Sequence, residues 1–68
     1  MTLLGQLVKS FGSIQVRRYV EQIDPDGYEL GLNFVHHVDG NRARFLGASA
    51  SLSEAIAIAV SHANRGQP

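Results

Sequence analysis

The sequence predicts a single α+β domain spanning residues 1–68, in which a three-stranded antiparallel meander lies between a short N-terminal helix and a longer C-terminal helix. Three observations support this α-β-β-β-α order. Apolar residues recur at helical spacing at both ends of the chain, an alternating apolar pattern fills its middle, and two turn signals, DPDG and DGN, divide that middle into strands.

The first segment, TLLGQLVKSFG at residues 2–12, is expected to form the short helix. Thr2 suits the N-cap and Gly12 suits the C-terminal end. Gly5 costs such a helix about 1 kcal/mol relative to alanine, so the helix would depend on packing. The apolar residues at helical spacing are Leu3, Leu4, Leu7, Val8 and Phe11.

The middle segment predicts three strands, at residues 13–23, 28–38 and 42–48. DPDG favours a type I turn in which Gly27 takes a positive φ, and DGN at residues 39–41 predicts a second tight turn. The central strand alternates strictly, which predicts one face toward the core and one toward solvent. The set expected to face the core is Tyr28, Leu30, Leu32, Phe34, His36 and Val38.

Residues 52–65 predict the second helix, packed on one face of the sheet. Ser51 and Glu54 have the spacing of a capping box, in which the glutamate reaches back to the N–H of the cap residue. The helix is expected to lie on the sheet face that bears Leu30, Leu32, Phe34 and Phe45. The residues expected to contact that face are Leu52, Ala55, Ile56, Ala59, Val60 and Ala63.

Ile58 falls outside that apolar stripe, beside Glu54, His62 and Arg65. It either packs under the first helix, is simply exposed, or marks a protein interface. A small domain without disulfides gains most from a second chain over such a position. We therefore predict self-association through the second helix or the adjacent sheet edge, with Ile58 at the contact and the three polar residues around it.

Composition excludes several classes of protein. The chain has no cysteine, so it has neither a disulfide framework nor a thiol nucleophile. Six Lys/Arg balance six Asp/Glu, which gives no overall field to attract nucleic acid or an acidic membrane. No stretch approaches the roughly 20 apolar residues that span a bilayer, and the N-terminal segment lacks a signal-peptide pattern. A cytoplasmic protein with no membrane contact is expected.

No motif predicts catalysis, a cofactor or a metal ion. His36 and His37 are adjacent in a strand, so their side chains point to opposite faces and cannot chelate one ion. Glu54 and His62 are more than two helical turns apart, with no nucleophile between them. We therefore expect no enzyme activity and no bound cofactor.

The outer face of the sheet is expected to carry basic, polar and aromatic side chains. Arginine beside an aromatic ring can bind phosphate and stack on a base, so nucleic acid is the alternative ligand, although Glu21 and Glu29 on the same face oppose it. The residues of this predicted patch are Arg17, Tyr19, Asn33, His37, Arg42 and Arg44.

The segment GASASLSEAIAIAVSHA resembles the C-terminal part of double-stranded-RNA-binding domains. It has Leu52 and Ser53 where that family has paired lysines, so the resemblance implies a degenerate member that binds protein or dimerises. The chain also resembles HicB-type antitoxins, through the order of a DPDGY turn, two strands and an SLSEAI helix, and this likeness implies binding to a toxin protein. The residues that match the RNA-binding pattern are Gly47, Ser51, Ala55, Ala59 and Ala63.

These patterns together predict a small non-catalytic binding module that acts through protein–protein contacts. A homodimer or a complex with a protein target is expected, and nucleic acid is not favoured. A regulator or inhibitor encoded by a phage or mobile element would suit so short a chain.

Overall fold

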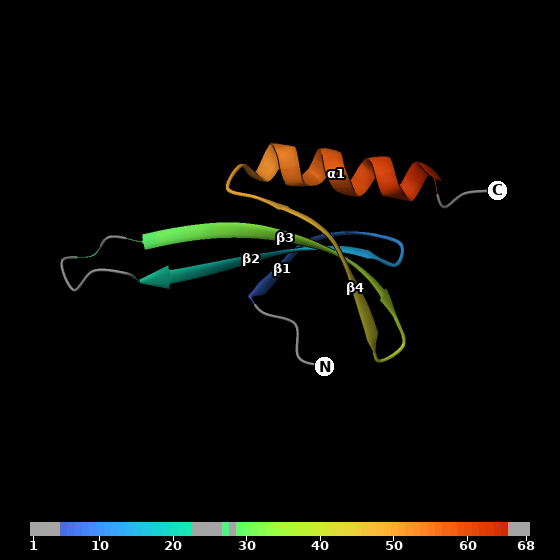
Figure 1. Ribbon diagram of the computed structural model, residues 1–68, viewed down its shortest axis with the longest axis horizontal. Helices are drawn as coiled ribbons and strands as arrows, with labels where there is room; N and C mark the ends of the chain where they lie inside the picture. The colour runs from blue at the N-terminus through green and yellow to red at the C-terminus, as the bar shows by residue number, and fades with distance from the viewer. Residues whose placement is uncertain (1–4, 23–26, 28, 66–68) are drawn as a thin grey trace.

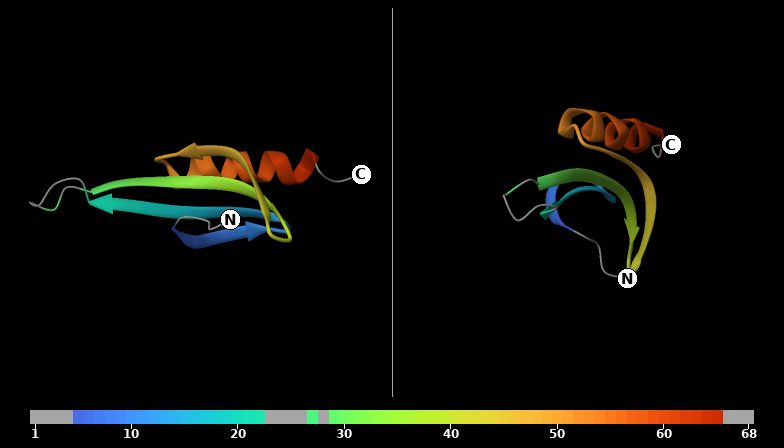
Figure 2. Two further views of the ribbon diagram at one scale, coloured as in Figure 1. Left: turned by 60° about the horizontal axis from the view of Figure 1, so that its bottom comes forward. Right: turned by 60° about the vertical axis from the view of Figure 1, so that its left-hand side comes forward.

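The chain forms four antiparallel strands followed by one helix, in the order β-β-β-β-α. The computed structural model describes residues 5–22, 27 and 29–65. The sheet has the strand order β1-β2-β3-β4, and α1 lies across one face (Figure 1). The sheet bends strongly, and the helix lies on its outer, convex side (Figure 2). The elements are β1 (Gln6–Phe11), β2 (Ile14–Gln22), β3 (Glu29–Asp39), β4 (Arg42–Ser49) and α1 (Leu52–Arg65).

The predicted N-terminal helix is wrong, because its described part is strand β1. Phe11 pairs with Ile14, which leaves Gly12 and Ser13 as a two-residue turn. Gly12 has a φ of 61°, and no residue other than glycine has a positive φ in the described chain, which together indicate a type II′ hairpin turn. Cross-strand pairing therefore overrides the helical spacing of the apolar residues. Residues 2–4 of the predicted helix lie outside the described part.

The three predicted strands are present as β2, β3 and β4. Gly27 has a φ of 99°, as the DPDG signal predicts, while Ile23, residues 24–26 and Tyr28 lie outside the described residues. The predicted DGN turn is also present: Asp39 pairs with Arg42, and Gly40 has a φ of 60°. The meander is therefore connected by glycine-containing turns.

The β2–β3 hairpin is longer than the strands on either side of it. β1 pairs with β2 only as far as Arg18, and β4 pairs with β3 only as far as Asn33. The remaining pairs, from Tyr19 opposite Leu32 to Gln22 opposite Glu29, form a two-stranded arm that extends from the sheet (Figure 1). An isolated two-stranded ribbon is at best marginally stable in water.

The helix covers the face of the sheet opposite to the one predicted. Val16 of β2 pairs with Val35 of β3, and both side chains are fully buried. Because side chains alternate along a strand, Phe34 must point to the other face. The fully formed core is small: Ile14, Val16, Val35, Ala55 and Ala59.

Side-chain size explains why the helix packs on that face of the sheet. α1 presents Ala55 and Ala59 to the sheet, and both are fully buried. Alanine lets a helix approach closely only where the sheet also carries small side chains, which the two valines provide. The larger side chains on this side of the sheet lie around that contact: Ile14 completes the core, and Phe11 and Leu46 pack against it. Leu52 and Val60, which were expected in the core, are instead exposed.

Both edge strands contain a β-bulge. β1 shifts register between Leu7 and Lys9, and β4 shifts opposite Val35 and His36. The exposed Arg42 and Arg44 lie on β4. Bulges and charged side chains on edge strands are the usual means of preventing further strands from pairing. The edges of the sheet are therefore poor sites for another chain to join.

The turn between β1 and β2 yields a direct test of the strand assignment. Gly12→Ala should destabilise the protein by about 1–2 kcal/mol, because an L-residue resists a positive φ in a type II′ turn. Thermal or urea unfolding of this variant measures the change. The matched control Ser13→Ala, at the neighbouring turn position, should be nearly neutral. Equal stability of the Gly12 variant and wild type would contradict the turn, since alanine would be tolerated at a helix end.

Candidate functional site

The sheet face that points away from α1 is the main candidate site, and we call it the open face. None of the described elements covers it. Its members follow from alternation and register, because residues opposite each other in the ladder share a face. The open face comprises Leu7, Ser10, Gln15, Arg17, Tyr19, Glu21, Leu30, Leu32, Phe34, His36, Val38, Ala43, Phe45 and Ala48.

An aromatic cluster lies on the open face. The ring centroids of Phe34 and Phe45 are 6.4 Å apart, and those of His36 and Phe45 are 5.8 Å apart, both in edge-on geometry. The rings of Phe34 and His36 are 6.4 Å apart. Phe45 is nevertheless 59% exposed. The cluster is therefore well ordered by its internal contacts while its largest apolar side chain faces solvent.

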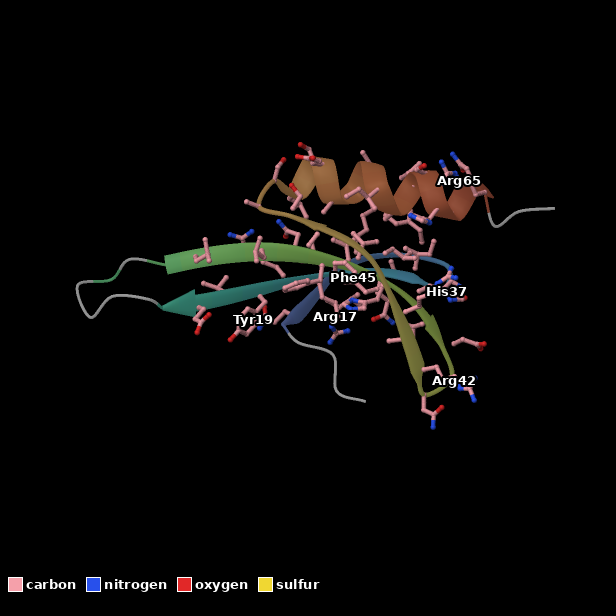
Figure 3. The ribbon with its side chains drawn as sticks, viewed as in Figure 1. Arg17, Tyr19, His37, Arg42, Phe45 and Arg65 are labelled. Carbon is pink, nitrogen blue, oxygen red and sulfur yellow. The ribbon has the colours of Figure 1, made fainter. Side chains whose placement is uncertain are left out.

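Arg17 is held against the open face by two hydrogen bonds. Its Nη1 donates to Oε1 of Gln15 at 3.0 Å, and its Nη2 donates to the carbonyl of Gly5 at 3.3 Å. The side chain thus links β2 to the residue before β1. Nε of Arg17 is removed from solvent and has no hydrogen-bond partner. Figure 3 shows Arg17 and Tyr19 on the side of the sheet away from α1.

The surroundings of His36 disfavour its protonated form. Burial lowers its pKa below the ordinary value of 6.5, and the nearby positive charge of Arg17 lowers it further. Its Nδ1 is buried without a hydrogen-bond partner. Both effects disfavour the imidazolium, because a charge would gain no compensating contact there.

The structure separates the predicted basic patch into two faces. Arg17 and Tyr19 lie on the open face as predicted. His37 is opposite Arg44 on the face that α1 covers, and Arg42 lies near the tip of the β3–β4 hairpin (Figure 3). Asn33 is fully buried rather than exposed. The six residues therefore do not form one surface. The predicted patch combined residues whose side chains point to opposite faces of the sheet.

Asn33 connects three parts of the fold instead. Its Nδ2 donates to the carbonyls of Ser49 at 3.1 Å and Ala50 at 3.3 Å, where β4 leads into α1. Its Oδ1 lies 3.5 Å from Nη1 of Arg18 on β2. A buried amide with partners on both atoms fixes how the helix leaves the sheet.

The start of α1 follows the predicted cap with one change. The hydroxyl of Ser51 accepts a hydrogen bond from the N–H of Glu54 at 3.3 Å. The N–H of Ser51, however, donates to the hydroxyl of Ser49, which in turn donates to the carboxylate of Glu54. Ser49 thus relays the contact that the glutamate was predicted to make directly. Glu54 has this structural role, and its place in an interface stays a prediction.

Ile58, expected outside the apolar stripe, packs within its own chain, and its predicted place in an interface stays a prediction. It is half-buried against the core, and its Cδ1 and Cγ2 lie against Gly47 of β4, 3.3 Å from the position of an added Cβ. The β4 bulge directs both Leu46 and Gly47 toward the helix, which makes room for this isoleucine. His62 is half-buried and Arg65 is exposed. Their predicted interface role has no test in the structure.

A second concave region lies between the end of the sheet and α1. Phe11, Ile14, His37 and His62 line this open cleft.

Residues 5–22, 27 and 29–65 contain no group of three or more potential metal ligands close enough to hold an ion. Within the same residues, no helix has the length and apolar character needed to cross a membrane.

Comparison with known proteins returned no relative: no protein family, no curated protein and no solved structure matches the chain.

The sequence did not predict the open face as a site, because its apolar side chains on β3 and β4 were assigned to the core. Part of the signal was available. In the DGN signal, Gly40 and Asn41 form the two-residue turn, which sets Asp39 opposite Arg42. Counting back along both strands from that pair places Phe45 opposite His36. The relation of β2 to β3 could not be counted in this way, because their connection is longer.

The Asn33 contacts yield a stability test. Asn33→Ala should destabilise the fold by about 1–3 kcal/mol, because two backbone carbonyls and the Arg18 side chain lose a partner inside the protein. Chemical unfolding monitored by circular dichroism measures the change. Asn41→Ala, in the exposed β3–β4 turn, is the matched control and should lie within about 0.5 kcal/mol of wild type. A neutral Asn33 variant would show that the connection to α1 is held by other contacts.

The lowered pKa of His36 yields a pH test. Between the folded pKa and 6.5, the unfolded chain binds more protons at this position than the folded one, so stability rises with pH through that window. The melting temperature should therefore fall as pH drops below 6.5, and His36→Gln should reduce that fall. His37 and His62 are common to both proteins and serve as internal controls. Identical pH profiles for the two proteins would contradict a neutral, buried His36.

Proposed function

We propose that this protein is a non-catalytic binding module and that it binds another protein through the open face. The observation that carries the proposal is Phe45, which is 59% exposed within an ordered aromatic cluster. Contiguous exposed apolar surface with a few polar groups is the usual mark of a protein contact. Leu30, 44% exposed, extends the apolar surface along β3, and Leu7, 50% exposed, lies beyond Arg17 on β1.

The composition of the open face favours protein over nucleic acid. Aromatic side chains and arginine are enriched at the centres of protein interfaces, and charged residues are depleted there. The charged groups on this face are Arg17 and Glu21, of opposite sign. Arg42, Arg44 and His37, which were predicted to contact phosphate, lie elsewhere. A phosphate-binding surface needs an excess of positive charge, and the chain as a whole has a formal net charge of zero.

The wider role that the sequence predicts is part of this proposal. The module acts as a regulator or inhibitor, in the cytoplasm, without catalysis or cofactor, and a phage or mobile element is the expected source. The small fully formed core supports a binding role, because a chain of this size gains stability from whatever covers its remaining apolar surface.

Paired bait variants test the proposal. Tagged wild type, Phe45→Lys and Val60→Lys are used to capture proteins from nuclease-treated extract of cells that contain the gene. Val60, 37% exposed on α1, is the matched apolar position outside the open face. Wild type and the Val60 variant should retain the same protein, and the Phe45 variant should lose it. Retention should change little between low and moderate salt.

Three results would contradict the proposal. Equal capture by wild type and the Phe45 variant would remove the open face as the binding surface. Loss with the Val60 variant alone would assign binding to α1. Nucleic acid that is retained from a parallel extract without nuclease treatment, and is lost steeply with rising salt, would support the alternative of phosphate contacts.

A further inference from the structure

We propose that the partner on the open face is a second copy of this chain, related by a twofold axis that crosses β2 at Tyr19. This inference rests on the proposed function, because it names the protein that the open face binds. Three features of the structure support it: the blocked sheet edges, the charges along β2, and the apolar side chains that this axis sets opposite each other.

The two edges of the sheet are unsuited to the contact, which leaves its face. Bulges interrupt β1 and β4, and the exposed arginines of β4 further discourage strand addition. The β2–β3 arm has the opposite character: Tyr19 opposite Leu32, and Glu21 opposite Leu30, lie on its open-face side. A second sheet packed over this face would also cover the arm, which is marginal as a free ribbon.

The charges on β2 are arranged to complement themselves. Arg17 and Glu21 lie on the same face, two positions before and two after Tyr19. Each is roughly 6.6 Å along the strand from Tyr19, so they are about 13 Å apart and do not pair with each other. A twofold axis through Tyr19 that runs across the strand makes the two copies of β2 antiparallel. It then sets Arg17 of each chain opposite Glu21 of the other.

The apolar side chains beside Tyr19 also fit two copies in this arrangement. Phe34 is opposite Arg17, and Leu30 is opposite Glu21, in the β2–β3 ladder. The same axis therefore sets Phe34 of each chain opposite Leu30 of the other, with Tyr19 and Leu32 in the row on the axis. Leu30 is 44% exposed in the single chain. Packed sheets are normally about 10 Å apart, a gap that side chains of this size fill. α1 stays on the outer surface of each copy.

A charge-swap experiment tests the pairing. Light scattering at several concentrations should give wild type about twice the 7.4 kDa chain mass. Arg17→Glu sets two glutamates against each other, and Glu21→Arg sets two arginines against each other, so each variant alone should lose the dimer. An equal mixture of the two restores both opposite-charge contacts and should recover the dimer mass. The double variant carrying both changes should dimerise alone and shows that each substitution is compatible with folding.

Cross-linking tests the position of the axis. The chain has no native cysteine, so Tyr19→Cys introduces a single thiol. A bis-maleimide with a spacer of about 10 Å, the spacing of packed sheets, should join two such chains efficiently. Arg42→Cys, near the tip of the β3–β4 hairpin, is the control and should give little cross-linked product.

The failure of this inference differs from the failure of the proposed function. A wild type that stays monomeric to about 1 mM, where even binding worth about 4 kcal/mol is visible, overturns the dimer. If Phe45→Lys then still abolishes capture of a foreign protein, the binding role of the open face stands. A mixture of the charge variants that behaves as each does alone, or a dimer that Tyr19→Cys does not cross-link, overturns the proposed axis.

Discussion

The close approach of an alanine surface to a valine surface determines the architecture of this protein. Ala55 and Ala59 of α1 lie on Val16 and Val35, and all four are fully buried. Dispersion contacts require atoms within about 4 Å, so the two alanines of the helix contact the sheet only where small side chains lie beneath them, while Ile14 completes the buried core beside them. Gly47 extends this requirement, since Ile58 occupies the space that a side chain there would take. Every larger apolar residue of β3 is consequently left on the other side.

The second half of the fold could be predicted because its signals are local. Ser51 and Glu54 define where α1 begins, Gly27 takes the positive φ that its turn signal predicts, and the Asp39–Asn41 turn joins two strands. The first segment could not be predicted from apolar spacing alone, since Leu7, Val8 and Phe11 suit a helix as well as a bulged strand. Only the Gly12–Ser13 pair distinguishes them, as a short glycine-first connection between two apolar runs is typical of a hairpin.

The candidate site was harder to predict than the fold, because it depends on which face of the sheet is covered. Alternation separates Phe34 from Val35 but does not say which of them meets the helix. The larger apolar area of Phe34 favoured it as the core residue. In the structure, close packing against the alanines of α1 places Val35 in the core instead. Assigning the wrong face of β3 to the core also placed Asn33 on the surface. Its amide is instead buried and holds the connection to α1. The sequence placed Arg17 and Tyr19 correctly on the uncovered face. In β2, the apolar residues Ile14 and Val16 both point to the core, so the residues between and after them point away from it.

Each strand pairs with its neighbour in sequence, and this has a kinetic consequence. The sheet order β1-β2-β3-β4 contains no crossover, and the turns after Phe11 and Asp39 each span only two residues. Contacts between residues close in sequence form with little loss of chain entropy, so domains of this kind fold rapidly for β proteins. The aromatic surface of the open face is ordered and exposed as soon as the sheet has formed, and exposed apolar surface of this kind favours aggregation.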